Sequence, residues 1–257
     1  MFATPPRQKQ RSMAARAVSD HLRNGSVPSA DLVVRSGSID VAVATFGEGT
    51  PAMFIHGWGG SAADMMPLAA AYAEAGFRAI VFDMPGHGRS TGRESSLVEF
   101  LQVMRSVTCA LGAPELIVGH SFGGAAAIFG ITEIGLPVRG AVLVSPAPGP
   151  AYYVARFARA VGLPSARTDG MVRQLVERVG RSLESLDAVV AAQHATVPAL
   201  VFHDPADREV PFEFSTKIAN AWTGSRLVEA PSLGHKRILR DPAVIAAAVE
   251  FATSVRR

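Results

Sequence analysis

The chain alternates between short segments that are apolar at almost every position and longer segments whose apolar residues recur at helical spacing. The short apolar segments are 52–57, 77–83, 115–120, 140–147, 198–204 and 224–230, and each has the length of one strand. Segments 63–76 and 95–112 have apolar residues three or four positions apart and end on a glycine, which predicts helices. A last helix is predicted over 241–255, with Asp241 as its N-cap.

Strands that are apolar throughout are buried on both faces, and helices between them form right-handed crossovers. We therefore expect an α/β fold with a mostly parallel central sheet flanked by helices. Segment 32–47 differs, because it contains two strands joined by a tight turn at Ser36-Gly37 and so predicts an antiparallel hairpin at the start of the sheet.

A helical stretch at 149–196 interrupts the alternation and contains Tyr152, Tyr153 and Phe157. It leaves one strand end and returns at the next strand, so we expect it to lie over the carboxyl edge of the sheet, where open α/β sheets bind ligands. The predicted organisation is a basic tail and short helix at 1–30, a core domain at 31–148 and 197–257, and a helical lid at 149–196.

Composition sets limits on the kind of protein. The chain has 257 residues, 48% of them hydrophobic and 18% charged, which is typical of a soluble globular domain. Its formal charge of +3 is too small to indicate nucleic-acid binding. No apolar stretch reaches the roughly 20 residues of a membrane span. Cys109 is the single cysteine, so no intrachain disulfide is possible; we expect it to be buried in a helix and the protein to be cytoplasmic.

The start of the chain is basic, with no acidic residue before Asp20; its cations are Arg7, Lys9, Arg11 and Arg16. It lacks the apolar core of a secretory signal. We interpret it as a solvated tail, with a transit peptide or a docking segment for a partner or an anionic surface as alternatives. The oligomeric state is not indicated by the sequence.

Ser121 lies where a predicted strand gives way to a predicted helix. Gly119-His120-Ser121-Phe122-Gly123 has the spacing G-x-S-x-G, and small residues follow it. A serine nucleophile held on a strained strand-to-helix turn needs such neighbours, because bulky side chains would crowd the turn. Ser90 has the same spacing of glycines but follows a loop, so we interpret it as loop structure. Ser121 is the predicted nucleophile.

Backbone amides near Ser121 are candidates for an oxyanion hole. The helix that starts at Phe122 has free N–H groups and a dipole that favour negative charge beside the serine. In this type of turn the N–H of the next residue, here Phe122, is one donor, and the loop after an earlier strand supplies the other. The segment HGWGGS at 56–61 is such a loop, which makes Trp58 the second candidate.

A serine nucleophile needs a base, and the base needs an orienting carboxylate. Folds with this turn carry them in the order Ser, acid, His. If the acid follows the strand at 198–204, His235 is the histidine that remains, in a loop after the strand at 224–230. The acids after 198–204 are Asp204, Asp207 and Glu209, and spacing alone leaves the choice open.

From about residue 33 to 255 the chain resembles the α/β-hydrolase superfamily. The motifs that carry the resemblance are HGWGG at 56–60, DMPGHGRS at 83–90, the turn around Ser121, HDPAD at 203–207 with Val210-Pro211, and GH at 234–235. The common family form H-G-x-x-D places the acid at Asp207, and Asp204-Pro205 departs from the usual glycine. The resemblance thus implies a triad of Ser121, His235 and Asp207.

The activity implied by the resemblance is two-step acyl transfer without a cofactor. Because the lid stretch is aromatic and aliphatic, we expect an ester hydrolase for a small or medium apolar acyl group, with Tyr152, Tyr153 and Phe157 as candidate substrate contacts. The alternatives are C–C bond hydrolysis or peroxidase-type chemistry on the same triad, and a non-catalytic ligand receptor or partner protein. The seven histidines show no metal-ligand spacing, so no metal is expected.

Overall fold

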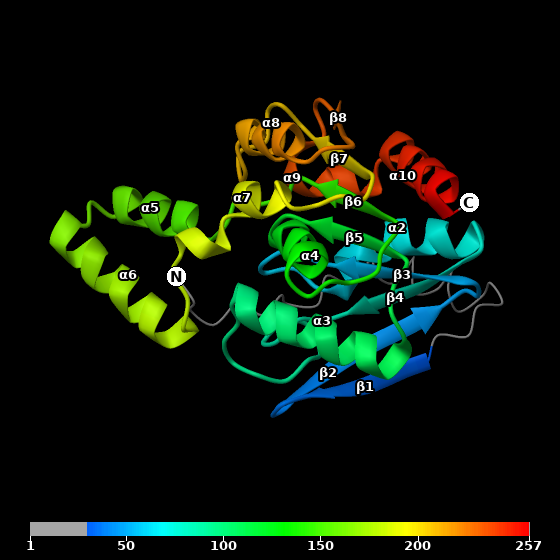
Figure 1. The fold of residues 1–257 in the computed structure, drawn as a ribbon, viewed down its shortest axis with the longest axis horizontal. Coiled ribbons are helices and arrows are strands. Elements are labelled where there is room, and N and C mark those ends of the chain that lie inside the picture. Colours follow the sequence, from blue (N-terminus) through cyan, green and yellow to red (C-terminus); the bar gives the residue numbers. More distant parts are fainter. Residues whose placement is uncertain (1–29, 257) are drawn as a thin grey trace.

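The computed structural model describes residues 30–256 and contains one eight-stranded sheet (Figure 1). The strands are β1 (Ala30–Ser36), β2 (Ile39–Phe46), β3 (Thr50–Ile55), β4 (Phe77–Phe82), β5 (Leu116–His120), β6 (Gly140–Val144), β7 (Ala199–His203) and β8 (Ser225–Glu229). Their order across the sheet is β1-β2-β4-β3-β5-β6-β7-β8. Strands β3 to β8 pair in parallel, as predicted. Of the tail and short helix predicted for residues 1–30, residues 1–29 lie outside the described residues, and Ala30 is the first residue of β1.

The predicted hairpin forms the start of the sheet. Strand β1 pairs antiparallel with β2, and β2 pairs antiparallel with β4. The turn lies one residue later than expected, because Ser36 still pairs with Ile39 across the sheet. Gly37 takes the turn position with a φ of 57°, a conformation that glycine adopts without the steric cost that serine would incur.

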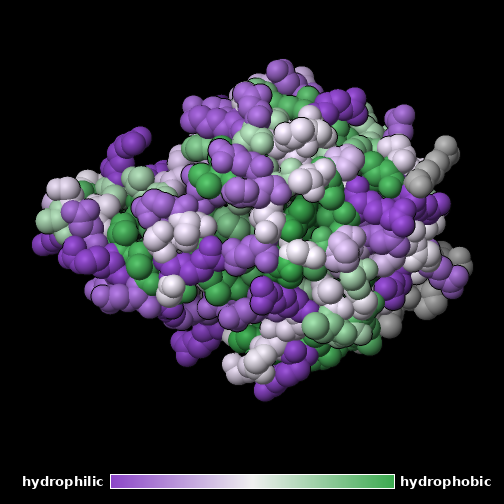
Figure 2. All heavy atoms as spheres, viewed as in Figure 1, coloured by the Kyte–Doolittle hydropathy of each residue, from purple (hydrophilic) through white to green (hydrophobic). Residues whose placement is uncertain are grey.

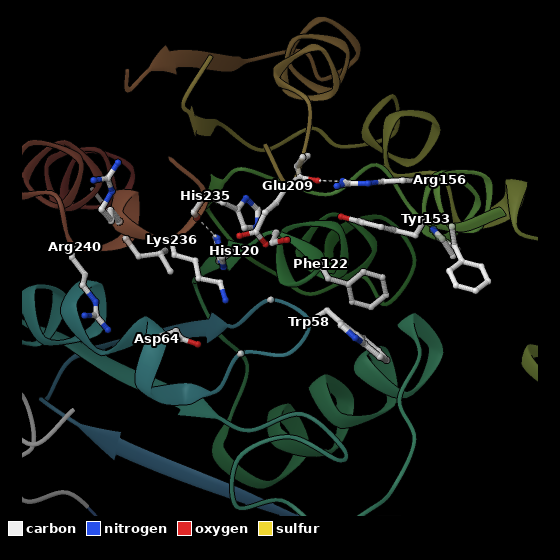
Figure 3. A pocket seen from close by; sticks show the side chains of 18 of the residues that line it. Trp58, Asp64, His120, Phe122, Tyr153, Arg156, Glu209, His235, Lys236 and Arg240 are labelled. Atoms are coloured by element: carbon white, nitrogen blue, oxygen red, sulfur yellow. Dashed lines mark hydrogen bonds and ion pairs between the residues drawn. The ribbon is translucent and has the colours of Figure 1, made fainter. Parts of the chain in front are cut away.

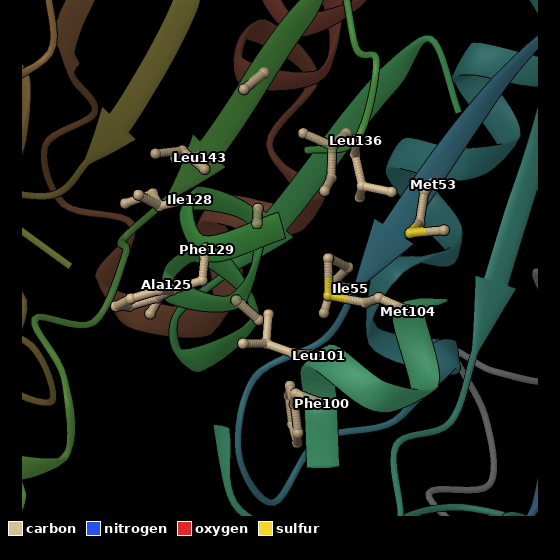
Figure 4. Packing of buried hydrophobic residues seen from close by; sticks show 14 of the residues in the cluster. Met53, Ile55, Phe100, Leu101, Met104, Ala125, Ile128, Phe129, Leu136 and Leu143 are labelled. Carbon is tan, nitrogen blue, oxygen red and sulfur yellow. The ribbon is translucent and has the colours of Figure 1, made fainter. Parts of the chain in front are cut away.

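Helices cover both faces of the sheet. Those that pack on the sheet are α2 (Ala62–Glu74), α3 (Leu97–Leu111), α4 (Phe122–Thr132), α7 (Ala188–Ala192), α8 (Phe212–Ala221) and α10 (Pro242–Arg256). One apolar cluster joins α3, α4, α7 and α8 to the sheet, and a second joins α2 and α10 to the other face. Figure 4 shows the first cluster, with Phe100, Leu101 and Met104 of α3 facing β3 and α4. Strands β5, β6 and β7 are buried at every position, which explains their continuous apolar sequence.

Two local expectations have different outcomes. The carboxylate of Asp241 accepts hydrogen bonds from the N–H groups of Ala243 and Val244, both at 3.0 Å, so it caps α10 as predicted. Cys109, in contrast, is exposed, and the expectation that it is buried was wrong. It lies nine positions after the buried Phe100, about half a turn around the helix, and so faces away from the core.

The stretch between β6 and β7 is helical. It contains α5 (Pro150–Ala160), α6 (Ser165–Val179) and the short 3₁₀ helix η1 (Glu184–Leu186) before α7. Figure 1 shows α5 and α6 extending away from the sheet. Val154 of α5, Leu175 of α6 and Leu183 form a small buried apolar cluster of their own. On the face in Figure 2, apolar and hydrophilic residues are interspersed over this pair and over the sheet domain. None of the helices within residues 30–256 is both long and apolar enough to cross a membrane.

Candidate active site

Ser121 occupies a strained junction between β5 and α4. Its φ is 53° and its ψ is −120°, a region that residues with a side chain rarely adopt. Surrounding hydrogen bonds hold this conformation: the Ser121 N–H donates to the carbonyl of Val144 at 2.9 Å, and the Gly124 N–H donates to the carbonyl of Ser121 at 2.8 Å. The backbone therefore has the geometry of a turn that presents a serine at the carboxyl edge of the sheet.

The glycines around Ser121 are required by close backbone approach. A Cβ at Gly123 would collide with the carbonyl oxygen of Ile55, and one at Gly119 would collide with the carbonyl oxygen of Gly123. A Cβ at Gly57 would lie 2.9 Å from the Cβ of Ser121. The small residues that follow β5 thus allow α4 to start directly against β3.

His235 and Asp207 are joined by a hydrogen bond. The Nδ1 of His235 lies 2.7 Å from the Oδ2 of Asp207, and because a carboxylate can only accept, Nδ1 carries the hydrogen. The side chain of His235 is only 5% exposed and that of Asp207 is buried. His235 belongs to a one-turn helix, α9 (Gly234–Arg237), rather than to the irregular loop expected.

Asp207 is held as an ionised acceptor. Its Oδ1 accepts from the N–H groups of Glu209 at 2.8 Å and Val210 at 3.2 Å, and the Nε2 of His203 lies 3.2 Å from its Oδ2. Burial raises the pKa of Asp207, but hydrogen bonds from His203 and His235, with the charge of His235, outweigh it. The net effect is a pKa well below the usual range of an aspartate.

The other two candidate acids have different positions. Asp204 accepts from the N–H of Ala206 through Oδ1, and from the N–H of Gly234 through Oδ2, so it ties its own loop to the one that carries His235. Burial raises the pKa of Asp204, and the backbone hydrogen bonds that it accepts lower it below its ordinary value. Glu209 is exposed, with its Oε2 4.0 Å from the Nε2 of His235.

His120 supports the backbone of His235. Its Nε2 lies 2.8 Å from the carbonyl oxygen of His235, and the two rings are 4.7 Å apart. Because a carbonyl only accepts, this Nε2 carries a hydrogen. Burial lowers the pKa of His120 to about 3, and the charges of His235 and Lys236 act in the same direction. His120 is therefore neutral and adds no positive charge beside Ser121.

The segment after β3 is fixed next to the serine. The N–H of Gly59 donates to Nε2 of His87 at 3.0 Å, and burial lowers the pKa of His87 to about 4, which keeps this nitrogen available as an acceptor. The Trp58 ring meets the Phe122 ring edge-on, with 5.7 Å between centroids. Phe122 is the first residue of α4, so its N–H has no acceptor within the helix.

A pocket of about 560 Å³ brings these groups together. Ser121, His235, Trp58 and Phe122 line it, together with Tyr153 and Phe157 from α5 (Figure 3). Burial raises the pKa of Tyr153, and an interaction with the Ser121 side chain opposes the rise. Tyr152 lies instead against Phe214, with 4.9 Å between ring centroids, and is not among the residues that line the pocket.

Ser90 has a structural position. Its hydroxyl donates to the carbonyl of Asp83 and accepts from the N–H of Ala42 at 2.9 Å, which ties the loop after β4 to β2. This agrees with its interpretation as loop structure. No group of three or more His, Cys, Asp or Glu side chains in the described part of the chain is arranged to hold a metal ion.

Of the six charged residues that line the pocket, sequence reasoning named only Glu209, as a candidate acid. Four are cationic and two are acidic: Arg156, Lys236, Arg237, Arg240, Asp64 and Glu209. Lys236 and Arg237 follow His235 directly in the chain, which was the one available signal. Arg156, Asp64 and Arg240 come from separate elements, so their presence in one pocket depends on the tertiary structure.

Curated proteins with similar sequences cover only parts of the chain. A non-heme haloperoxidase from Rhodococcus erythropolis is 33% identical over 95 residues, which is 36% of this chain and 35% of that protein. A pimeloyl-acyl-carrier-protein methyl ester esterase from Shewanella woodyi is 25% identical over 159 residues, 62% of this chain and 59% of that protein. The chain thus spans less than two thirds of the length of the curated relatives that it matches.

Solved structures and a family match agree on the fold. A monoacylglycerol lipase from Paleococcus ferrophilus superposes with a TM-score of 0.67 at 24% identity, over 84% of this chain and 99% of that one. At this identity the likeness shows the fold alone. The alpha/beta hydrolase family matches residues 52–248, which include the Ser121 turn and both His235 and Asp207. This chain is therefore a member of the alpha/beta hydrolase family.

Proposed function

We propose that the protein is a serine hydrolase that cleaves carboxylic esters with a small or medium apolar acyl group. The observation that carries the proposal is the strained Ser121 in one pocket with His235, whose Nδ1 is hydrogen-bonded to the buried Asp207. The similarity to the methyl ester esterase from Shewanella woodyi supports ester hydrolysis as the reaction class. The apolar wall formed by Trp58 and Phe122 supports an apolar acyl group.

The proposed first step is acylation of Ser121. With Nδ1 of His235 donating to Asp207, the Nε2 is left without a hydrogen and can take the proton of the serine hydroxyl as the oxygen attacks the ester carbonyl. The ionised Asp207 stabilises the imidazolium that forms. The N–H groups of Trp58 and Phe122 would donate to the oxyanion, and His235 then protonates the departing alcohol.

The second step removes the acyl group. Water enters, and His235 takes a proton from it as its oxygen attacks the acyl carbonyl. His235 then gives that proton to the Ser121 oxygen as the bond to the acyl group breaks and the acid leaves. In this mechanism Tyr153 and Phe157 contact the substrate from α5. We further propose that α5 and α6, within the predicted lid stretch 149–196, act as a lid, since α5 contributes to the pocket from outside the sheet domain. The end of the stretch, at α7, packs with the core instead.

The test combines active-site labelling with pre-steady-state kinetics. A fluorophosphonate probe should label Ser121, and a chromogenic acyl ester should give a burst of alcohol release equal to the labelled fraction. Ser121→Ala should lose labelling and lower kcat by on the order of 10⁴-fold or more. Ser254→Ala, a surface change on α10 where the hydroxyl donates only to the Phe251 carbonyl, is the matched control. Labelling that persists in Ser121→Ala would exclude the proposed nucleophile.

A further inference from the structure

Two of the cations that line the pocket, Lys236 and Arg240, lie on one side of the candidate catalytic groups. In Figure 3, Lys236 and Arg240 lie to one side of His235, whereas Trp58 and Phe122 lie to the other. The pocket thus has an apolar wall at Trp58 and Phe122 and a cationic wall at Lys236 and Arg240, with the proposed reacting groups between them. Arg156 is not part of the cationic wall, because it lies beside Tyr153 on the other side of His235 (Figure 3). An ester with a purely apolar body would use only the apolar wall.

Two of the four cations are already engaged by the protein. Arg156 donates to the carbonyl of Glu209 at 2.7 Å, and Arg237 donates to the carbonyls of Leu233 at 2.9 Å and Ser232 at 3.1 Å. These guanidinium groups hold loops in place. The side chains of Lys236 and Arg240 have no hydrogen bond or ion pair with any residue in the range 30–256, and both residues are exposed at the pocket. They are free to bind a ligand.

The two carboxylates of the pocket do not neutralise this pair. Asp64 accepts from the N–H of Ser61 at 3.1 Å as part of the capping of α2. Glu209 lies by the ring of His235, with its carboxylate 4.0 Å from Nε2. The positive charge of Lys236 also reaches the buried ring of His120, where it disfavours protonation. Lys236 therefore lies close to the proposed site of reaction, where it lines the pocket with Ser121.

We propose that the substrate is an ester that carries an anionic group, a carboxylate or a phosphate, which binds Lys236 and Arg240 while its apolar part lies against Trp58 and Phe122. This inference rests on the proposed ester hydrolysis and specifies its substrate class. An ammonium and a guanidinium without protein partners form charge-assisted hydrogen bonds with such oxyanions. Because both cations are exposed, the attraction is screened by salt.

The kinetic test uses phenyl hexanoates that differ only at the para position: a carboxylate, a phosphonate, or a neutral carboxamide. The wild-type protein should favour an anionic ester over the neutral one by about tenfold in kcat/KM at low salt, through KM, and less so at about 0.5 M salt. Lys236→Met should lower this ratio about fivefold, and Lys236→Met with Arg240→Gln should abolish it. The carboxylate and phosphonate esters show which anion is preferred.

Lys217→Met is the matched control. Lys217 lies on α8 and pairs with Glu213 at 3.4 Å, away from the pocket lining, so this variant should keep the wild-type ratio. A wild-type protein that hydrolyses all three esters with the same kcat/KM would overturn the inference. So would a Lys236→Met variant that keeps the wild-type ratio.

A binding measurement separates this inference from the proposed function. Trp58 lines the pocket and Trp222 is buried, so para-hexyloxybenzoate and its amide can be titrated by tryptophan fluorescence without any turnover. Tighter binding of the carboxylate, lost in Lys236→Met, would support the anionic site even if no ester were hydrolysed. Equal binding of the two compounds would refute the anionic site, whether or not esters are cleaved.

Discussion

The buried, neutral His120 should make the stability of the protein depend on pH between neutrality and pH 5. A histidine has an ordinary pKa of 6.5, and in the folded protein burial lowers that of His120 to about 3. As the pH falls, the His120 ring is therefore protonated near pH 6.5 in the unfolded chain but only near pH 3 in the folded protein. Because the unfolded state binds more protons in this interval, the free energy of unfolding falls as the pH falls.

The size of the effect follows from the two pKa values. At pH 5 the His120 ring is protonated in nearly every unfolded molecule and in almost no folded one. One pKa unit corresponds to about 1.36 kcal/mol, so His120 alone should remove about 2 kcal/mol of unfolding free energy between pH 7 and pH 5. His87, whose pKa burial lowers to about 4, should remove a similar amount.

The assay compares wild-type protein with His120→Gln. Glutamine keeps an N–H donor for the carbonyl of His235 but does not titrate. Urea unfolding measures the free energy of unfolding at each pH, and its decrease from pH 7 to pH 5 should be about 2 kcal/mol smaller in the variant than in the wild type. Unfolding of the variant at pH 5 should also take up about one proton fewer than unfolding of the wild type. His194→Gln, at an exposed position on the surface, should leave both quantities as in the wild type. A variant whose loss matches that of the wild type within about 0.5 kcal/mol would refute the reasoning.

Three further predictions concern the site and its support. Asp207→Asn should lower kcat/KM for a chromogenic ester by about 10³- to 10⁴-fold, because an amide in this position favours the wrong tautomer of His235; a loss below tenfold would contradict the assignment. Gly123→Ala should lower the free energy of unfolding, measured by chemical denaturation, by about 2–4 kcal/mol, since the added Cβ collides with the Ile55 carbonyl. Its control is Gly170→Ala, where a Cβ meets only a guanidinium nitrogen at 3.8 Å; this variant should stabilise α6 by up to about 1 kcal/mol. Tyr153→Phe should lower kcat by about three- to tenfold with an unchanged thermal unfolding temperature, because it removes the phenol that interacts with the Ser121 side chain and keeps the ring; an unchanged kcat would show that the phenol has no part in the reaction.

The pattern of apolar residues determined the fold class, because a strand buried on both faces must be apolar at every position. Strands β5, β6 and β7 were predicted this way and are buried throughout. The turn at Ser121 could also be predicted, since a serine between an apolar strand and a helix that starts with small residues forms a recognisable local pattern. Exposure of Cys109 could not, because it depends on which side of α3 meets the sheet.

The tertiary structure decided which distant groups meet. Asp204 and Asp207 are nearly equivalent in the sequence, and the fold directs one carboxylate to the ring of His235 and the other to a backbone N–H of the same loop. The pocket also depends on the tertiary structure. Lys236 and Arg240 lie across it from Trp58, which comes from a distant part of the chain. Sequence patterns record the local constraints of strands, helices and turns. The distance between side chains far apart in the chain depends on how helices pack on the sheet, and that appears only in the folded molecule.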